Sequence, residues 1–126
     1  GAVINPEREY AHKIKNKDKF ENLKAQAWQL VADRFVKTYA AVTRGDPIDP
    51  EDIISISSSI PDLQQLKIEL STPRKRYSKR GLDMVETKDE LASRGIASPN
   101  LADAFIMGAT SHIHRSSGTL FTRGRQ

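Results

Sequence analysis

Cysteine is absent from this sequence of 126 residues, and aromatic residues make up only 6% of it. Without cysteine there is no disulfide bond and no thiolate metal site, and we expect a reducing compartment. Long apolar runs are also missing, since none reaches the roughly 20 residues of a membrane-spanning helix. The charged stretch NPEREYAHKIKNKDK near the start does not fit a signal peptide. We therefore predict a cytoplasmic protein without membrane contact.

Several sequence patterns of catalysis are missing as well. No G-x-x-x-x-G-K-[ST] motif occurs, which excludes an ATPase of the P-loop class. The serines between residues 53 and 60 have neither a nearby histidine nor the glycines of a nucleophile elbow, so acyl-transfer chemistry has no support. His112 and His114 form an H-x-H pair, which on its own is a weak signal for a metal site.

The sequence does contain a modest excess of positive charge. Twenty Lys and Arg against sixteen Asp and Glu give a net charge of +4. This charge is compatible with a polyanionic partner without requiring one. The length allows one domain with a modest core, and that core must be aliphatic because aromatic side chains are few.

Hydrophobic periodicity predicts a long helix that begins at Lys17 and ends at Gly45, with Arg44 in its last turn. Apolar residues recur in this helix at steps of three and four, which places them on one stripe. We predict that the stripe faces the core; its members are Phe20, Leu23, Ala27, Leu30, Val31, Phe35, Tyr39 and Val42.

Shorter elements are predicted between residues 49 and 95. Asp49-Pro50 is typical of a capped helical turn, residues 53–60 fit either a strand or a helix, and residues 61–71 fit a helix. Residues 72–88 are predicted to form a hairpin whose turn lies at 78–81, followed by a short helix that ends at Gly95.

The last predicted element is a helix that starts at Ser98-Pro99, with a serine N-cap followed by proline at the first helical position. The fold class is therefore α+β and mostly helical. We expect residues 1–110 to form one unit and residues 111–126 to form a flexible basic tail.

Asp103 stands out because the helix around it is almost wholly apolar. A carboxylate buried among apolar groups must be paired, protonated or bound to a cation, and Mg²⁺ and Mn²⁺ take carboxylate oxygens as ligands. The alternative is an acid at a helix edge that is either exposed or paired with an arginine. One aspartate is not a metal site, and the spacing of the sequence shows no second ligand.

The predicted hairpin carries a cluster of positive charge, with five basic residues within seven positions around Tyr77. Such a ribbon is suited to contacting DNA phosphates without reading bases. The alternative is a solvated edge hairpin whose charges discourage pairing with other strands. The candidate DNA-binding residues are Arg74, Lys75, Arg76, Lys79 and Arg80.

Three blocks of the sequence resemble a known family when they are taken in order. They are NLKAQAWQLVADRFVKTYAAVTRGDPIDPEDIISISS, LKIELSTPRKRY and SPNLADAFIMG, within residues 8–109. Together they are similar to the C-terminal part of the large terminase subunit of tailed bacteriophages and prophages. The most specific block is SPNLADA, which resembles the family's recurring Ser-Pro-(Asp/Asn)-x-Ala-Asp-Ala signature.

The resemblance implies a function and a fold. Large terminases are DNA-packaging motors, in which an ATPase drives double-stranded DNA through the portal and a nuclease of RNase H-like fold cuts concatemeric DNA. That nuclease holds two divalent metals, Mg²⁺ or Mn²⁺, with a cluster of acids. The resemblance assigns Asp103 as a catalytic metal ligand, and it implies the portal and the small terminase subunit as partners.

The resemblance also implies that something is missing. The family's other metal-binding acids lie on strands that precede the matched region, as does the ATPase. We therefore expect this chain alone to be inactive as a nuclease, and its unpartnered apolar faces to favour a homodimer. Two alternatives stay open: a non-catalytic module that docks on DNA or on the portal, and a small helical domain with no site.

Overall fold

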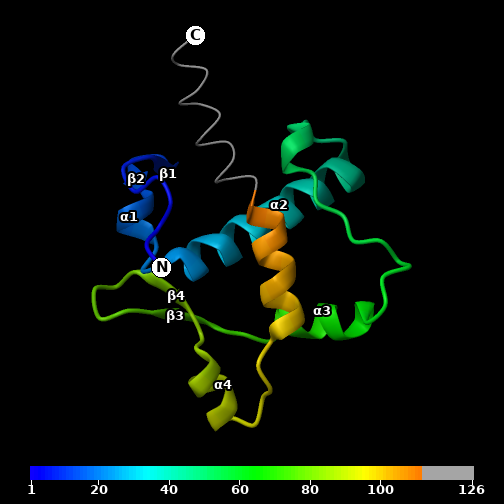
Figure 1. Ribbon diagram of the computed structural model, residues 1–126. Helices are drawn as coiled ribbons and strands as arrows, with labels where there is room; N and C mark the ends of the chain where they lie inside the picture. The colour runs from blue at the N-terminus through cyan, green and yellow to red at the C-terminus, as the bar shows by residue number, and fades with distance from the viewer. Residues whose placement is uncertain (112–126) are drawn as a thin grey trace.

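The computed structural model describes residues 1–111, and Figure 1 shows how their elements are arranged. The chain is α+β, as predicted, with two small antiparallel hairpins and a larger share of helix. The helix over residues 100–111 crosses the long helix α2 (Leu23–Arg44) near the middle of the molecule. Among the described residues, no helix combines the length and apolar character that crossing a membrane requires.

The N-terminal residues form a small unit of their own. Strands β1 (Glu9–Ala11) and β2 (Ile14–Lys15) pair antiparallel, and the turn between them holds Lys13 at φ 62°. The short helix α1 (Asn16–Lys19) follows directly. The predicted helix start at Lys17 was therefore wrong, because a non-helical segment over residues 20–22, with an extended residue at its start, separates α1 from α2.

That extended residue is Phe20, which is 1% exposed and forms an isolated parallel bridge with Asp83. Helix α2 then starts after Asn22, whose side chain accepts a hydrogen bond from the backbone N–H of Ala25 at 2.9 Å. This is an ordinary N-cap. The tertiary contact of Phe20 overrides the helical periodicity that the sequence carries through this point.

Helix α2 ends at the predicted residue. Gly45 adopts the left-handed conformation at φ 71°, and its N–H donates to the carbonyl oxygens of Ala40 and Ala41. Glycine is favoured at this position because a Cβ is strained at positive φ.

Replacing Gly45 with alanine is expected to lower the free energy of unfolding by about 1 kcal/mol, because of this backbone strain. A Cβ at Gly45 would meet no atom within 4 Å, so packing does not contribute. Gly108→Ala is the matched control: Gly108 lies in the helix over residues 100–111 with equally open surroundings. There alanine should raise the free energy of unfolding by about 0.5–1 kcal/mol. Urea denaturation measures both, and shifts of the same sign would contradict the assignment.

The segment after α2 contains the predicted turn. The 3-10 helix η1 (Pro50–Asp52) is capped by Asp49, whose side chain accepts from the N–H of Glu51. Residues 53–60 form neither a helix nor a strand, which settles the ambiguity of that run. Helix α3 (Leu63–Ser71) follows, with Leu66 buried on the predicted face.

The predicted hairpin is present. Strands β3 (Lys75–Tyr77) and β4 (Asp83–Val85) pair antiparallel, with Arg76 opposite Met84. Helix α4 (Lys88–Ser93) follows and begins with a capping box, in which Thr87 and Glu90 exchange hydrogen bonds with each other's backbone N–H groups. Gly95, at φ 77°, lies two residues beyond its end.

The core lies where the helix over residues 100–111 crosses α2. Its buried members are Ala27, Val31, Ile54 and Ile106, and Phe35 stacks on Phe105 at a centroid distance of 6.2 Å. The predicted core stripe is therefore right for the first half of α2. It was wrong for Tyr39 and Val42, which are 67% and 80% exposed, because α2 extends past the crossing point.

Candidate functional site

The helix that carries Asp103 begins at residue 100, close to the predicted start, but the predicted serine N-cap was wrong because the free N–H groups bind an acceptor from elsewhere. A carboxylate oxygen of Glu69 accepts hydrogen bonds from the N–H groups of Leu101 and Ala102, at 2.8 and 3.2 Å. The Ser98 hydroxyl instead donates to the side chain of Asn100. A glutamate on α3 therefore places a negative charge at the positive end of this helix.

Glu69 is ionised more readily than an ordinary glutamate. Burial by itself would raise the pKa of its carboxyl group, but the hydrogen bonds from Gln65, Ala102 and Leu101 bring the pKa below the usual value. No local sequence pattern predicts this cap, because Glu69 lies more than thirty residues before the helix.

Asp103 lies at the edge between the two faces of its helix. Ala102 and Ile106 on one side are buried, whereas Leu101 and Met107 on the other are 39% and 60% exposed. The Asp103 side chain is 28% exposed, so it is neither enclosed nor turned fully into solvent.

The charged group nearest to Asp103 is a lysine, where the alternative interpretation expected an arginine. Lys88 Nζ lies 4.0 Å from Asp103 Oδ2, at the limit of an ion pair. Lys88 is the first residue of α4, so the site joins the start of that helix to the first turn of the helix over residues 100–111. The side chain of Lys88 is 59% exposed, which leaves it free to move away from the carboxylate.

The described residues do not complete a metal site around Asp103. Within residues 1–111, no group of three or more His, Asp or Glu side chains is placed to hold a metal ion. Two acids near it in sequence have other partners: Glu86 binds Arg94, and Glu90 binds Arg76. Two divalent cations need several anionic ligands to offset their charges, so the residues present fit one ligand of such a centre and not the whole.

The five candidate DNA-binding residues lie on or beside the β3–β4 hairpin. Three of them are in ion pairs: Lys75 with Asp83 at 3.1 Å, Arg76 with Glu90 at 3.0 Å and Arg80 with Glu21 at 3.0 Å. Their side chains are nevertheless 48%, 55% and 68% exposed. The hairpin therefore presents cationic groups to solvent, with part of their charge balanced.

The other two candidates differ from each other. Arg74 donates its backbone N–H to Glu86 at 3.1 Å. Lys79 lies in the hairpin turn, is exposed, and has no acidic partner within the part of the chain that the structure describes. His112 and His114 lie outside the described residues, as does the predicted tail beyond Ser111.

A cleft of about 260 Å³ lies elsewhere, between the N-terminal unit and α2. Inside it the hydroxyl of Tyr10 donates to Asp33 at 2.7 Å, and burial together with this carboxylate raises the pKa of Tyr10 to about 12. Arg34 donates to the carbonyl oxygens of Ala109 and Ile53. Tyr10 and Asp33 thus bind each other, whereas the buried Arg34 Nε has no hydrogen-bond partner within residues 1–111. None of the predicted site residues lines the cleft.

Comparison with known proteins finds matches among solved structures. No protein-family model matches this sequence, and no curated protein matches it. The nuclease domain of the large terminase subunit gp2 of bacterial virus Sf6 matches with a TM-score of 0.78 and 33% identity, over 86% of this chain and 49% of that chain. A mutant of that domain, with manganese and beta-thujaplicinol, matches with a TM-score of 0.79 and 32% identity, with the same coverage. The same mutant with calcium matches with a TM-score of 0.77 and 32% identity, over 86% of this chain and 48% of that chain. The chain thus spans about half the length of the solved domains it matches.

Proposed function

Because this chain belongs with the nuclease domains of phage large terminase subunits, we propose that it forms part of the endonuclease that cuts concatemeric DNA during genome packaging. The observation that carries this proposal is the match over 86% of the chain at a TM-score of 0.79. The fold is a fragment of the RNase H-like class, and the SPNLADA block spans the start of the helix over residues 100–111. In a complete motor, the portal and the small terminase subunit would be the protein partners, in the cytoplasm of the bacterial host.

Asp103 is the proposed metal ligand and catalytic residue of this part of the domain. Its place supports the assignment: it is partly exposed, it has one exposed lysine at 4.0 Å, and it borders an apolar surface formed by Leu101 and Met107. The relatives with manganese and calcium support a divalent cation, Mg²⁺ or Mn²⁺, in the complete domain. The remaining ligands would come from residues other than those described here.

The β3–β4 hairpin is the proposed contact for the DNA backbone. Arg74, Lys75, Arg76, Lys79 and Arg80 supply the charge, and the exposed side chains of its turn are placed to approach phosphates. The hydrophobic side chains left exposed on α2 and on the helix over residues 100–111, Tyr39, Val42 and Met107 among them, support association with another protein surface. A homodimer is one form that this association can take.

The test is a plasmid-cleavage assay with Mg²⁺ or Mn²⁺. We expect supercoiled plasmid to be cleaved no faster with this chain alone than in a protein-free control, because one carboxylate cannot hold two cations. Cleavage that requires a divalent cation and disappears in Asp103→Ala would show that the chain is a complete nuclease and would overturn this expectation.

A further inference from the structure

We propose that the DNA-binding surface of this chain extends beyond the β3–β4 hairpin onto the β1–β2 hairpin, so that both turns contact the phosphate backbone of one duplex. The proposal rests on the proposed function, which makes double-stranded DNA the polyanion to be bound. It adds the turn at Lys13, a segment that the comparison and the sequence patterns do not mark as a DNA contact.

The N-terminal unit that carries the β1–β2 hairpin contacts the β3–β4 hairpin through the residues that follow β2. The carboxylate of Asp83, which is 7% exposed, receives Lys19 from the N-terminal unit at 3.0 Å and Lys75 from β3 at 3.1 Å. The backbone N–H of Glu21 donates to the carbonyl oxygen of Asp83 at 3.0 Å, and the side chain of Glu21 binds Arg80. These contacts place the N-terminal unit beside the β3–β4 hairpin, so the two hairpins are neighbours in the fold.

Positive charge is concentrated on this combined surface. Residues 1–24 and 74–83 contain eleven Lys and Arg against five Asp and Glu, an excess of six positive charges. The rest of the chain contains nine Lys and Arg against eleven Asp and Glu, an excess of two negative charges. The net charge of +4 is therefore unevenly distributed, with a positive excess in residues 1–24 and 74–83. Clustered positive charge of this kind is the electrostatic pattern of a nucleic-acid-binding surface.

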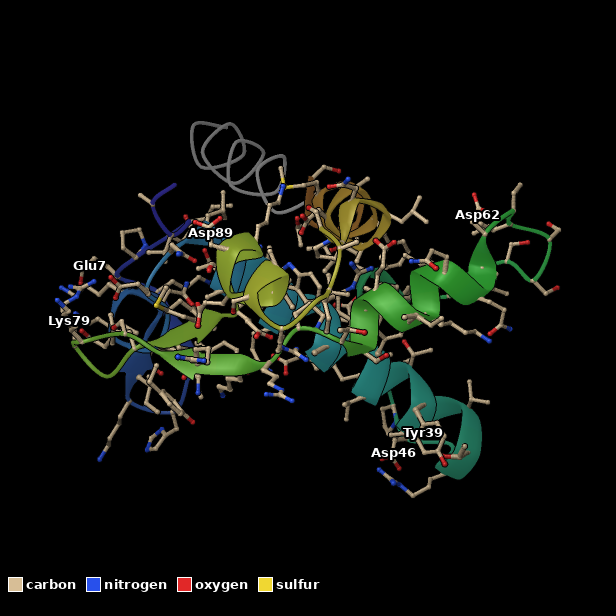
Figure 2. The ribbon with its side chains drawn as sticks, turned by 90° about the horizontal axis from the view of Figure 1, so that it is seen from below. Glu7, Tyr39, Asp46, Asp62, Lys79 and Asp89 are labelled. Carbon is tan, nitrogen blue, oxygen red and sulfur yellow. The ribbon has the colours of Figure 1, made fainter. Side chains whose placement is uncertain are left out.

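Three of the five acids on this surface, Glu7, Glu21 and Asp83, form ion pairs with neighbouring cations. Glu7 binds Lys15 at 2.8 Å and Lys17 at 2.7 Å, and these lysines lower the pKa of its carboxyl group to about 2. Figure 2 shows Glu7 and Lys79 at the same edge of the molecule, far from Asp62 and Tyr39.

Cations without an acidic partner remain at both turns. Lys13, at the tip of the β1–β2 hairpin, and Lys79, at the tip of the β3–β4 hairpin, are exposed and have no ion pair within residues 1–111. Arg8, beside β1, is also exposed and also has no ion pair within residues 1–111. These side chains can bind phosphates without first breaking an ion pair, so each should release condensed counterions when DNA binds.

Salt-dependent binding tests the proposal with the intact chain. Fluorescence anisotropy of a short labelled duplex of arbitrary sequence gives the slope of log K against log salt for wild type, Lys13→Ala, Lys79→Ala and the double variant. Each single substitution is expected to flatten the slope by about one unit, and the double variant by about two. Lys67→Ala is the matched control, since Lys67 is exposed on α3, away from both hairpins, and should leave the slope unchanged.

The outcomes separate this inference from the proposals that precede it. If Lys13→Ala behaves like Lys67→Ala while Lys79→Ala flattens the slope, the β1–β2 hairpin is not part of the surface and only the β3–β4 contact survives. If neither variant differs from wild type, or if the chain does not bind duplex DNA, the inference is overturned. The nuclease assignment is judged separately, by cleavage.

Discussion

Joining this chain to the unmatched half of the Sf6 gp2 nuclease domain is expected to give a protein that cuts plasmid DNA in Mn²⁺, and Asp103→Asn is expected to slow that cutting at least a hundredfold. The matched portions share 33% identity over 86% of this chain, which makes the replacement structurally reasonable. Substitution of one side chain next to a metal ligand already costs roughly 10–100-fold in affinity or activity. Loss of an anionic ligand should cost about as much or more, because the amide cannot offset cationic charge.

The control for this experiment is Asp62→Asn in the same chimera. Asp62 adopts φ 63° at the start of α3, and asparagine tolerates this conformation, so folding should be unaffected. Figure 2 places Asp62 at the far end of the molecule from the basic hairpins. Wild-type chimera and Asp62→Asn should relax supercoiled plasmid at similar rates. If the Asp103→Asn chimera cleaves plasmid as fast as the wild-type chimera, Asp103 is not a metal ligand.

Much of the fold could be predicted because its signals are local. Gly45 ends α2 through its own backbone preference, Asp49 caps the next residues, and Thr87 with Glu90 forms a box within one helical turn. In each case the residue and the backbone group that it binds lie within a few positions of each other. Such interactions form in the same way whatever the remainder of the chain does.

What could not be predicted depends on contacts between distant segments. Helix α2 starts later than its periodicity predicts because Phe20 pairs with Asp83. The helix over residues 100–111 is capped by Glu69, which lies on α3. The exposure of Tyr39 likewise follows from where one helix crosses another.

The candidate site shows the same limit. The sequence could single out Asp103, because a lone acid in an apolar helix is unusual in any fold. The sequence could not predict that Lys88 lies 4.0 Å from Asp103. Lys88 precedes Asp103 by fifteen residues and is brought near it by the folding of α4. The sequence also could not reveal how much of the hairpin's charge is balanced, because two of those ion-pair partners, Glu21 and Glu90, lie outside the hairpin.

Replacing Arg94 with methionine is expected to cause the largest loss of stability among substitutions of charged residues in this chain. Arg94 Nε and Nη2 each donate to the carboxylate of Glu86 at 2.7 Å, and Nη2 also donates to the carbonyl oxygen of Thr72 at 3.1 Å. Glu86 is 2% exposed, so the variant leaves a buried carboxylate without its counter-charge. The ratio of folded to unfolded protein should fall by about a hundredfold or more, as measured by urea denaturation at neutral pH.

Two variants of the same chain calibrate this effect. Arg76→Met removes an ion pair of similar length with Glu90, but both side chains are substantially exposed, at 55% and 35%. That loss should be about 0.5 kcal/mol or less, because solvent screens the pair. The double variant Glu86→Leu/Arg94→Met removes both buried charges and should recover most of the stability that Arg94→Met alone loses.

Acid titration distinguishes this ion pair from simple packing by Arg94. The hydrogen bonds from Arg94 lower the pKa of the Glu86 carboxyl group from 4.5 to about 2. In wild type, the contribution of the pair is therefore fully present above pH 4.5 and is lost as the pH falls towards 2. In Arg94→Met the carboxyl group lacks that partner, so the difference in melting temperature between wild type and variant should shrink across this pH range. A difference that stays constant from neutral pH to pH 2 would mean that Arg94 acts through its aliphatic contacts and not through its charge.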